Sequence, residues 1–186
     1  MSWIRMPLAI VILLLALAFA AGWFDLRFRR IPNWLSLSGA VLGIGLNVLL
    51  AGRYGAAESL LGILCAFAVY VPLFLLRAMG AGDVKLMIAI GAIAGPRNWF
   101  EIFLASALLG GVVALAFAIV KRRLRQTCGN TGTILLALSH GMLPFHADPK
   151  LDVQNTESLR MPHGTVIAGG VLIFLASHTF PNIFSL

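Results

Sequence analysis

The sequence predicts an all-α, polytopic integral membrane protein with about six transmembrane helices in one bundle. Of its 186 residues, 60% are hydrophobic and only 11% are charged, and the mean hydropathy is +0.93. A soluble domain carries about 25% charged residues, and a disordered chain has too little hydrophobicity to collapse. Both classes are therefore excluded, and we expect a single transmembrane domain over residues 1–186.

Six apolar segments are candidates for membrane spans. Most approach the roughly 20 residues that a helix needs to cross a hydrocarbon core. The fourth is the shortest, because Pro96 and Arg97 interrupt it. It crosses only if it begins around Gly82 and continues past the proline, or if the bilayer thins locally. Pro32 and Pro72 are expected at a helix start and a kink. The expected spans are residues 7–24, 34–51, 59–76, 83–97, 99–120 and 164–180.

The basic residues predict the orientation of these spans. Eleven of the 14 lysines and arginines fall on one side of the membrane, in the segments around 25–33, 77–85 and 121–160. The other side carries Arg5, Arg53 and Arg97. By the positive-inside rule, the first side is cytoplasmic and the N-terminus is periplasmic. Topology thus accounts for the basic pI of about 10.5, and we expect lipid rather than nucleic acid as a partner.

Two of the seven acidic residues lie where an apolar span meets the cytoplasmic face. These are Asp25, after the first span, and Asp83, at the start of the fourth. Ionisable groups at membrane depth are costly and usually mark a catalytic or transport site. The structural alternative is interfacial ion pairing, of Asp25 with Arg27 or Arg29 and of Asp83 with Lys85.

A glycine motif precedes the second aspartate. Gly80 and Gly82 lie directly before Asp83 in the sequence G-A-G-D-V-K-L-M. Residues without side chains would let a substrate strand approach the carboxylate.

A second motif follows the first aspartate, which opens the sequence D-L-R-F-R-R-I-P-N. Pro32 sets the turn into the second span, and Asn33 is a suitable N-cap for a helix beginning at Trp34. For this proline and asparagine, helix capping alone is the alternative to a functional role.

The pairing of D-x5-I-P-N with G-x-G-D-x-K-L-M resembles the type IV prepilin peptidase family of GxGD aspartic proteases. The likeness extends to Met161-Pro162-His163-Gly164, which is similar to the family's Pro-Tyr-Gly element with His in place of Tyr. The resemblance implies that Asp25 and Asp83 are the catalytic aspartates. It also implies that the substrate-binding residues include Gly80, Gly82, Lys85, Pro32 and Asn33.

The resemblance implies a peptidase that removes the short basic leader from prepilins at the cytoplasmic face of the bacterial inner membrane, with no cofactor. Bifunctional relatives that also methylate the new N-terminus carry paired CxxC motifs in an insert after the first span. Here that loop has about nine residues and no cysteine. We therefore expect no N-methylation, and a closer likeness to the small branch that processes Flp-type pilins.

Peptide hydrolysis by two carboxyl groups requires one ionised group, to take a proton from water, and one protonated group, to donate to the carbonyl oxygen. Such a pair titrates as a unit, and it forms here only if the first and fourth spans meet at their cytoplasmic ends. One alternative function is proton- or cation-coupled transport. Another is a non-catalytic pilus-assembly protein of the same fold.

Other residues receive weaker assignments. The loop 121–160 is expected to hold an interfacial or re-entrant helix near 133–144. The possible metal ligands of this loop include Cys128, His140 and His146. Their spacing matches no metal signature, so no metal site is expected. His163 either borders the active site or is an ordinary interfacial histidine. Interface anchors are expected at Trp23, Trp34 and Trp99, and close helix packing at Gly39, Gly43, Gly91 and Gly95.

Overall fold

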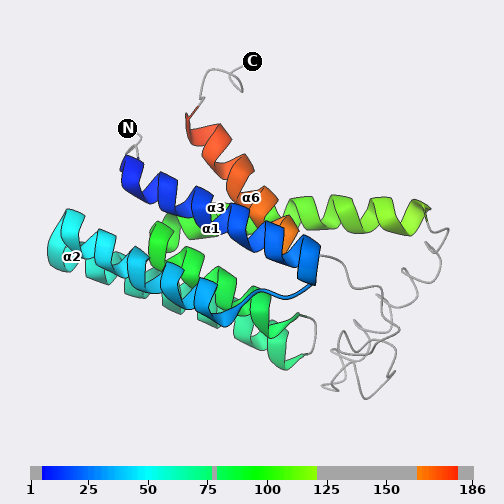
Figure 1. Ribbon diagram of the computed structural model, residues 1–186, viewed down its shortest axis with the longest axis horizontal. Coiled ribbons are helices and arrows are strands. Elements are labelled where there is room, and N and C mark those ends of the chain that lie inside the picture. Colours follow the sequence, from blue (N-terminus) through cyan, green and yellow to red (C-terminus); the bar gives the residue numbers. More distant parts are fainter. Residues whose placement is uncertain (1–5, 77–78, 121–162, 180–186) are drawn as a thin grey trace.

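The computed structural model describes residues 6–76, 79–120 and 163–179, and every helix or strand assigned in this part of the chain is an α-helix. Figure 1 shows the four elements, which are α1 (Leu8–Phe28), α2 (Asn33–Leu75), α3 (Ala81–Val120) and α6 (His163–Thr179). The predicted all-α class is confirmed. Several expectations fall outside the described residues, namely those for the loop 121–160 with its helix near 133–144, Arg5, Cys128, His140, His146, Met161 and Pro162.

α2 consists of two helical halves joined at Gly52, whose φ of 56° and ψ of −134° are accessible to glycine but strained for other residues. Asn47, before this break, donates a hydrogen bond from Nδ2 to Ser59 Oγ after it, over 2.9 Å. A straight helix would separate these residues by about 18 Å. The chain therefore reverses direction, and Figure 1 shows the two halves side by side.

α3 is broken in the same way at Gly95, where φ is 73° and ψ is 173°. Pro96 has no N–H, so the carbonyl of Ala92 loses its helical donor. Asn47 replaces that donor, because its Nδ2 donates to the carbonyl oxygens of Ala92 and Ile93, both over 3.1 Å. One amide side chain therefore supports the breaks in both long helices.

Three described helices are long and apolar enough to cross a membrane, namely Leu8–Phe28, Asn33–Leu75 and Ala81–Phe117, and α6 contributes a shorter apolar helix, His163–His178. The six predicted segments map onto α1, the two halves of α2, the two halves of α3, and α6. By length and composition three helices qualify as spans, and two of them, α2 and α3, are each divided by a break, at Gly52 and Gly95. Their outer surface exposes large apolar side chains such as Leu37 (67%), Leu49 (83%) and Leu108 (72%), which suits lipid contact rather than water.

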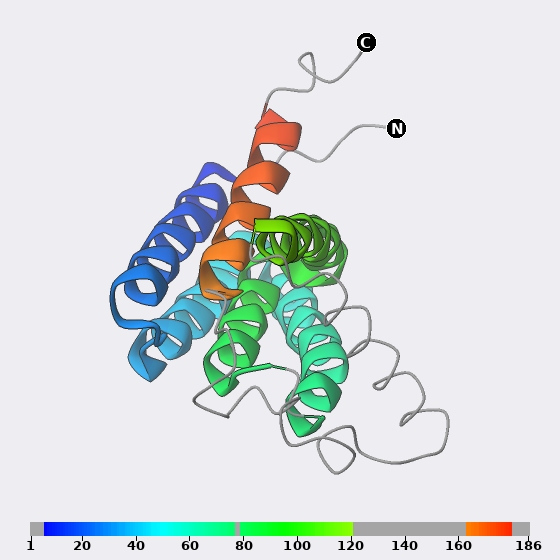
Figure 2. The ribbon, with the colours of Figure 1, turned by 90° about the vertical axis from the view of Figure 1, so that its right-hand side faces the viewer.

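The first half of α3 forms the centre of the bundle. Its apolar side chains are at most 1% exposed at Leu86, Met87, Ile90 and Ile93, and α3 packs against α1, α2 and α6. In the end-on view of Figure 2, α1 lies on one side of this half and the second half of α2 on the other. The start of α3, which carries Asp83, is therefore held from several directions.

Small residues allow the central helices to approach one another closely. Gly62 of α2 and Gly91 of α3 meet through their backbones, so a Cβ on Gly62 would overlap the Gly91 carbonyl. A Cβ on Gly43 would lie 2.5 Å from Ile93 Cγ1. The packing role predicted for Gly43 and Gly91 is confirmed, whereas Gly95 supplies a positive φ at the break.

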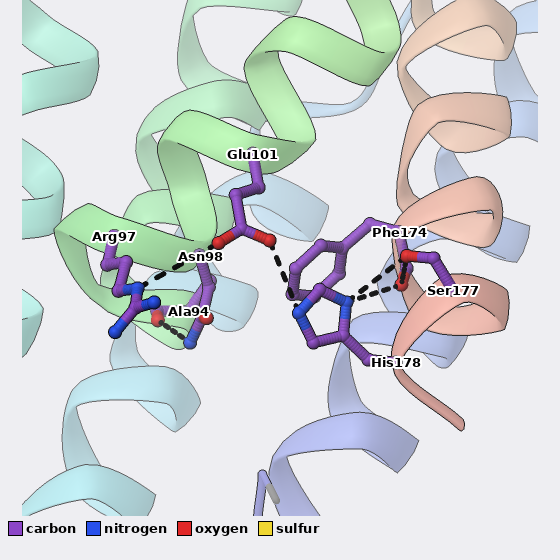
Figure 3. A network of polar contacts seen from close by, with 7 residues as sticks. All are labelled: Ala94, Arg97, Asn98, Glu101, Phe174, Ser177 and His178. Atoms are coloured by element: carbon purple, nitrogen blue, oxygen red, sulfur yellow. Dashed lines mark hydrogen bonds and ion pairs between the residues drawn. The ribbon is translucent and has the colours of Figure 1, made fainter. Parts of the chain in front are cut away.

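A polar network joins α6 to the second half of α3, as Figure 3 shows. Glu101 Oε2 lies 3.2 Å from His178 Nε2, and Glu101 Oε1 lies 3.9 Å from Arg97 Nε. The other ring nitrogen of His178, Nδ1, lies 3.0 Å from the carbonyl oxygen of Phe174. The network holds the end of α6 that is remote from His163.

The expected interface position of Trp99 is wrong, because this side chain is only 1% exposed. Its ring stacks on Phe103 with centroids 5.6 Å apart, and it meets the edge of Tyr70 at 6.3 Å. The reversal at Gly95 turns this residue toward the second half of α2 instead of toward the membrane surface. Trp23 and Trp34 are 68% and 61% exposed, and their assignment as interface anchors stays a prediction.

Gly62→Ala is expected to destabilise the bundle by about 1–3 kcal/mol, because the added Cβ would overlap backbone atoms of Gly91 that cannot yield easily. Gly45→Ala is the matched control, since a Cβ there meets nothing within 4 Å. Thermal unfolding of both variants in one detergent measures the difference. Equal unfolding midpoints for the two variants would contradict the close approach of these helices.

Candidate active site

Asp25 lies in the last turn of α1 and is nearly buried, with 7% of its surface exposed. The helix ends where Arg29 adopts a left-handed conformation, with φ 51° and ψ 32°, and donates its backbone N–H to the Asp25 carbonyl over 2.9 Å. A left-handed residue at this position closes a helix and redirects the chain. The Asp25 side chain is thus carried by a regular helix rather than by a loop.

Asp83 lies in the first turn of α3, directly after the glycine motif. The Gly80 carbonyl accepts hydrogen bonds from the N–H groups of Asp83 and Val84, over 3.2 and 3.4 Å, so Gly80 is the N-cap of α3. The Asp83 carboxylate in turn interacts with the backbone of Gly80, as the third residue of a capping box does. A Cβ on Gly80 would lie 3.3 Å from Asp83 Oδ2, a tight contact with the carboxylate.

The structure brings the two aspartates into one site, as the motifs lead us to expect. α1 and α3 pack against one another, and the Asp25 carboxylate acts electrostatically on that of Asp83. Asp25 is buried, whereas Asp83 is partly exposed. A pair of carboxyl groups at adjoining helix ends is therefore present, and Asp83 is its more exposed member.

Ile31 connects the three motif segments around this pair. A Cβ on Gly82 would lie 3.4 Å from Ile31 Cβ, and a Cβ on Gly164 would lie 2.9 Å from Ile31 Cδ1. The isoleucine of the I-P-N motif therefore packs between a motif glycine of α3 and the glycine at the start of α6. A side chain at Gly164 would press on Ile31, whereas a Cβ at Gly82 would only touch it.

The start of α6 supplies the hydrogen-bond partners of Asp25. Thr165 donates its backbone N–H to Asp25 Oδ2 over 2.9 Å, and its Oγ1 lies 3.3 Å from the same oxygen. A Cβ on Gly164 would lie 3.1 Å from Asp25 Cβ and Cγ. His163 also lies within electrostatic range of Asp25, so it borders the site. The sequence did not single out Thr165, and the one available signal was its place directly after the Pro-His-Gly element.

Lys85 and Asn33 form a separate contact between α3 and α2. Lys85 Nζ donates to Asn33 Oδ1 over 2.9 Å, so the suggested Asp83–Lys85 ion pair does not form in the structure. The two side chains lie two positions apart on a helix and point to different faces. Pro32, rather than Asn33, is the N-cap of α2, and Asn33 makes no capping hydrogen bond. The predicted capping role of Asn33 is wrong, because its oxygen is bonded to Lys85.

A groove opens beside this contact, with a cavity volume of about 340 Å³. We call it the Lys85 groove, and it is lined by Asn33, Ser36, Leu37, Ala40, Lys85 and Ile88. Its polar end lies next to the start of α3, and its walls are mostly apolar. Such a surface suits an apolar segment with a polar end.

Metal binding has no visible basis in the part of the chain that the structure describes. Within residues 6–76, 79–120 and 163–179, no three His, Cys, Asp or Glu side chains gather as metal ligands would. The two carboxyl groups of the described site can exchange protons with water and with a substrate.

Comparison with known proteins agrees with this geometry. The family model for the type IV leader peptidase family matches residues 12–115, a stretch that contains both aspartates and both motifs. Over 115 residues the chain is 30% identical to a prepilin leader peptidase/N-methyltransferase of Xanthomonas campestris pv. campestris. That alignment covers 58% of this chain and 40% of the relative. No solved structure matches the chain.

The family match covers more than half of the chain. It ends before α6 but includes the parts of α1 and α3 that carry Asp25 and Asp83. The protein belongs to the type IV leader peptidase family.

Proposed function

We propose that this protein is an aspartic endopeptidase that removes the short basic leader from prepilins, with Asp25 and Asp83 as its catalytic residues. The observation that carries the proposal is the meeting of these two motif aspartates at adjoining helix ends. Membership of the peptidase family supports hydrolysis rather than transport or scaffolding. The activity, the substrate and both catalytic assignments belong to the proposal.

The proposed reaction uses the two carboxyl groups in complementary states. The ionised aspartate takes a proton from water, and the resulting hydroxide attacks the carbonyl carbon of the scissile peptide. The protonated aspartate donates to the carbonyl oxygen, because two neighbouring carboxyl groups do not both ionise freely. When the C–N bond breaks, the leaving amine takes up a proton from the first aspartate. As the tetrahedral intermediate collapses to the carboxylic acid, one of its hydroxyl groups returns a proton to the second aspartate, so the pair is restored to its starting protonation state.

The Lys85 groove is the proposed seat of the apolar segment that follows the leader. Leu37, Ala40 and Ile88 offer it an apolar wall, and the Lys85 ammonium would repel the basic leader toward water. Gly80 and Gly82 leave the start of α3 without side chains, so the scissile bond can pass over it to the aspartates. Pro32 and Asn33 complete this contact region through the turn into α2.

The proposed orientation places this end of the bundle at the cytoplasmic face of the bacterial inner membrane. Eleven of the 14 lysines and arginines lie on that side in the predicted topology, which is the bias found in cytoplasmic loops. The N-terminus would then be periplasmic. Prepilin leaders are cleaved on the cytoplasmic side in the family that the motifs resemble.

N-methylation is not part of the proposed function. α1 ends at Phe28 and α2 begins at Asn33, so the connection between them has no room for an inserted domain. It contains no cysteine. We therefore assign the protein to a peptidase-only branch that processes Flp-type pilins.

Asp25→Asn and Asp83→Asn are each expected to lower prepilin cleavage by about 100-fold or more, because each removes one half of the acid–base pair. Co-expression with a Flp-type prepilin, followed by analysis of its size and mature N-terminus, measures the effect at matched membrane levels. Undiminished cleavage in either variant would defeat the aspartic mechanism. It would leave a scaffold or a transporter as the better description.

Ala40→Phe is expected to raise KM about tenfold, equal to about 1.4 kcal/mol of binding, with little change in kcat, because the ring would fill the Lys85 groove away from the aspartates. Val41→Phe is the matched control, since Val41 is 59% exposed and does not line the groove. Steady-state cleavage of a purified prepilin in detergent gives both constants. An unchanged KM in the groove variant would place the substrate elsewhere.

Mature pilin produced by this protein should carry a free, unmethylated N-terminus even when S-adenosylmethionine is supplied. Mass spectrometry of the cleaved pilin decides this directly. A bifunctional prepilin peptidase run in parallel serves as the positive control. A methylated product from this chain alone would refute the peptidase-only assignment.

A further inference from the structure

We propose that Thr165 is a positioning residue for Asp25, and that Gly164 is the small residue that allows the start of α6 to reach it. This inference rests on the proposed function, because it concerns one of the two proposed catalytic aspartates. It adds a third helix end to a site that the motifs describe with two.

The contact is specific to one oxygen of the carboxylate. Both donors of Thr165 address Asp25 Oδ2, at 2.9 Å from the backbone N–H and 3.3 Å from Oγ1. Two donors on one oxygen oppose rotation of the carboxylate about its Cβ–Cγ bond. Oδ1 is then held in a fixed direction and is the oxygen available for the reaction.

The backbone donor is available because of where Thr165 lies. It is the third residue of α6, and the first N–H groups of a helix have no partner within that helix. Such groups stabilise negative charge, and the helix dipole acts in the same sense. The donation to Asp25 therefore costs α6 none of its own hydrogen bonds.

Gly164 determines how closely this helix end can approach. A Cβ at this position would lie 3.1 Å from Asp25 Cβ and Cγ and 2.9 Å from Ile31 Cδ1. Ile31 Cδ1 is the end of a side chain and can shift, whereas Asp25 is buried and held by its hydrogen bonds to Thr165. A larger residue would push the Thr165 donors away from Oδ2.

The rest of α6 is held in a way that keeps the donors in place. Gly170 packs so tightly on α3 that a Cβ there would overlap Ser106. Farther along, His178 Nε2 lies 3.2 Å from Glu101 Oε2, the contact drawn in Figure 3. Sites built on helices that are fixed along their length hold catalytic groups more accurately than sites on loops.

Thr165→Val tests the hydroxyl donor, because it preserves the shape of the side chain and the backbone N–H. We expect kcat for prepilin cleavage to fall about two- to tenfold, the effect of losing one hydrogen bond, with KM unchanged. Thr165→Ser restores the hydroxyl and should recover most of kcat. A merely structural role would lower the yield of folded protein without this separation of kcat from KM.

Gly164→Ala tests the approach of the helix end and should lower kcat further, by up to about 100-fold, because misplacement of a catalytic group by about 1 Å has effects of that size. Gly45→Ala is the matched control, since its Cβ would meet nothing within 4 Å, and it should cleave as the unaltered protein does. Each kcat is normalised to the folded fraction recovered by gel filtration.

Wild-type kcat in both Thr165→Val and Gly164→Ala, with Asp25→Asn inactive, would overturn the positioning role and leave the proposed function standing. A rise in KM rather than a fall in kcat would also overturn it, because Thr165 would then contact the substrate. If Asp25→Asn itself cleaves normally, the proposed function fails first.

Discussion

The hydrogen bonds between Asp25 and the start of α6 are the contact on which the candidate site depends. A buried carboxylate is stable only when polar groups replace the water that it loses. Inside an apolar bundle the backbone N–H groups are already engaged, so free donors exist mainly at helix starts. Thr165 supplies them from α6, and Gly164 lets the backbone come close enough. Because the buried Asp25 carboxylate needs these hydrogen bonds, α6 must begin beside it.

The position of Asp83 depends on packing far from the site. Its helix is held in register by the break at Gly95, where the Asn47 amide donates to the carbonyls that the proline and glycine leave free. Unpaired carbonyls would be costly in an apolar interior, so the amide and the break belong together. The backbone contact between Gly62 and Gly91 then sets the distance between the halves of α2 and α3. Changes at these residues would move Asp83 relative to Asp25 without touching either.

The sequence alone indicated the helical class, both aspartates and the glycines beside them, because each of these is a local signal of composition or motif. It missed Thr165, since the partner of Asp25 comes from the other end of the chain and only the folded bundle joins them. It also misjudged Asn33, whose oxygen bonds Lys85 across two helices instead of capping its own. Trp99 was misplaced for a related reason, because the reversal at Gly95 buries a residue that its position in the span would expose.

Two repelling carboxyl groups can be held near one another in this protein because each lies against the positive end of a helix. The start of α6 donates a hydrogen bond to Asp25, and Asp83 lies over the start of its own helix at Gly80. Both partial positive charges offset the repulsion. Neither arrangement is available in the middle of an unbroken helix, so a carboxylate pair built in this way must lie where helices begin and end. The proposed function needs water, the second substrate of hydrolysis, at this pair, and the partly exposed Asp83 is the side from which it would arrive.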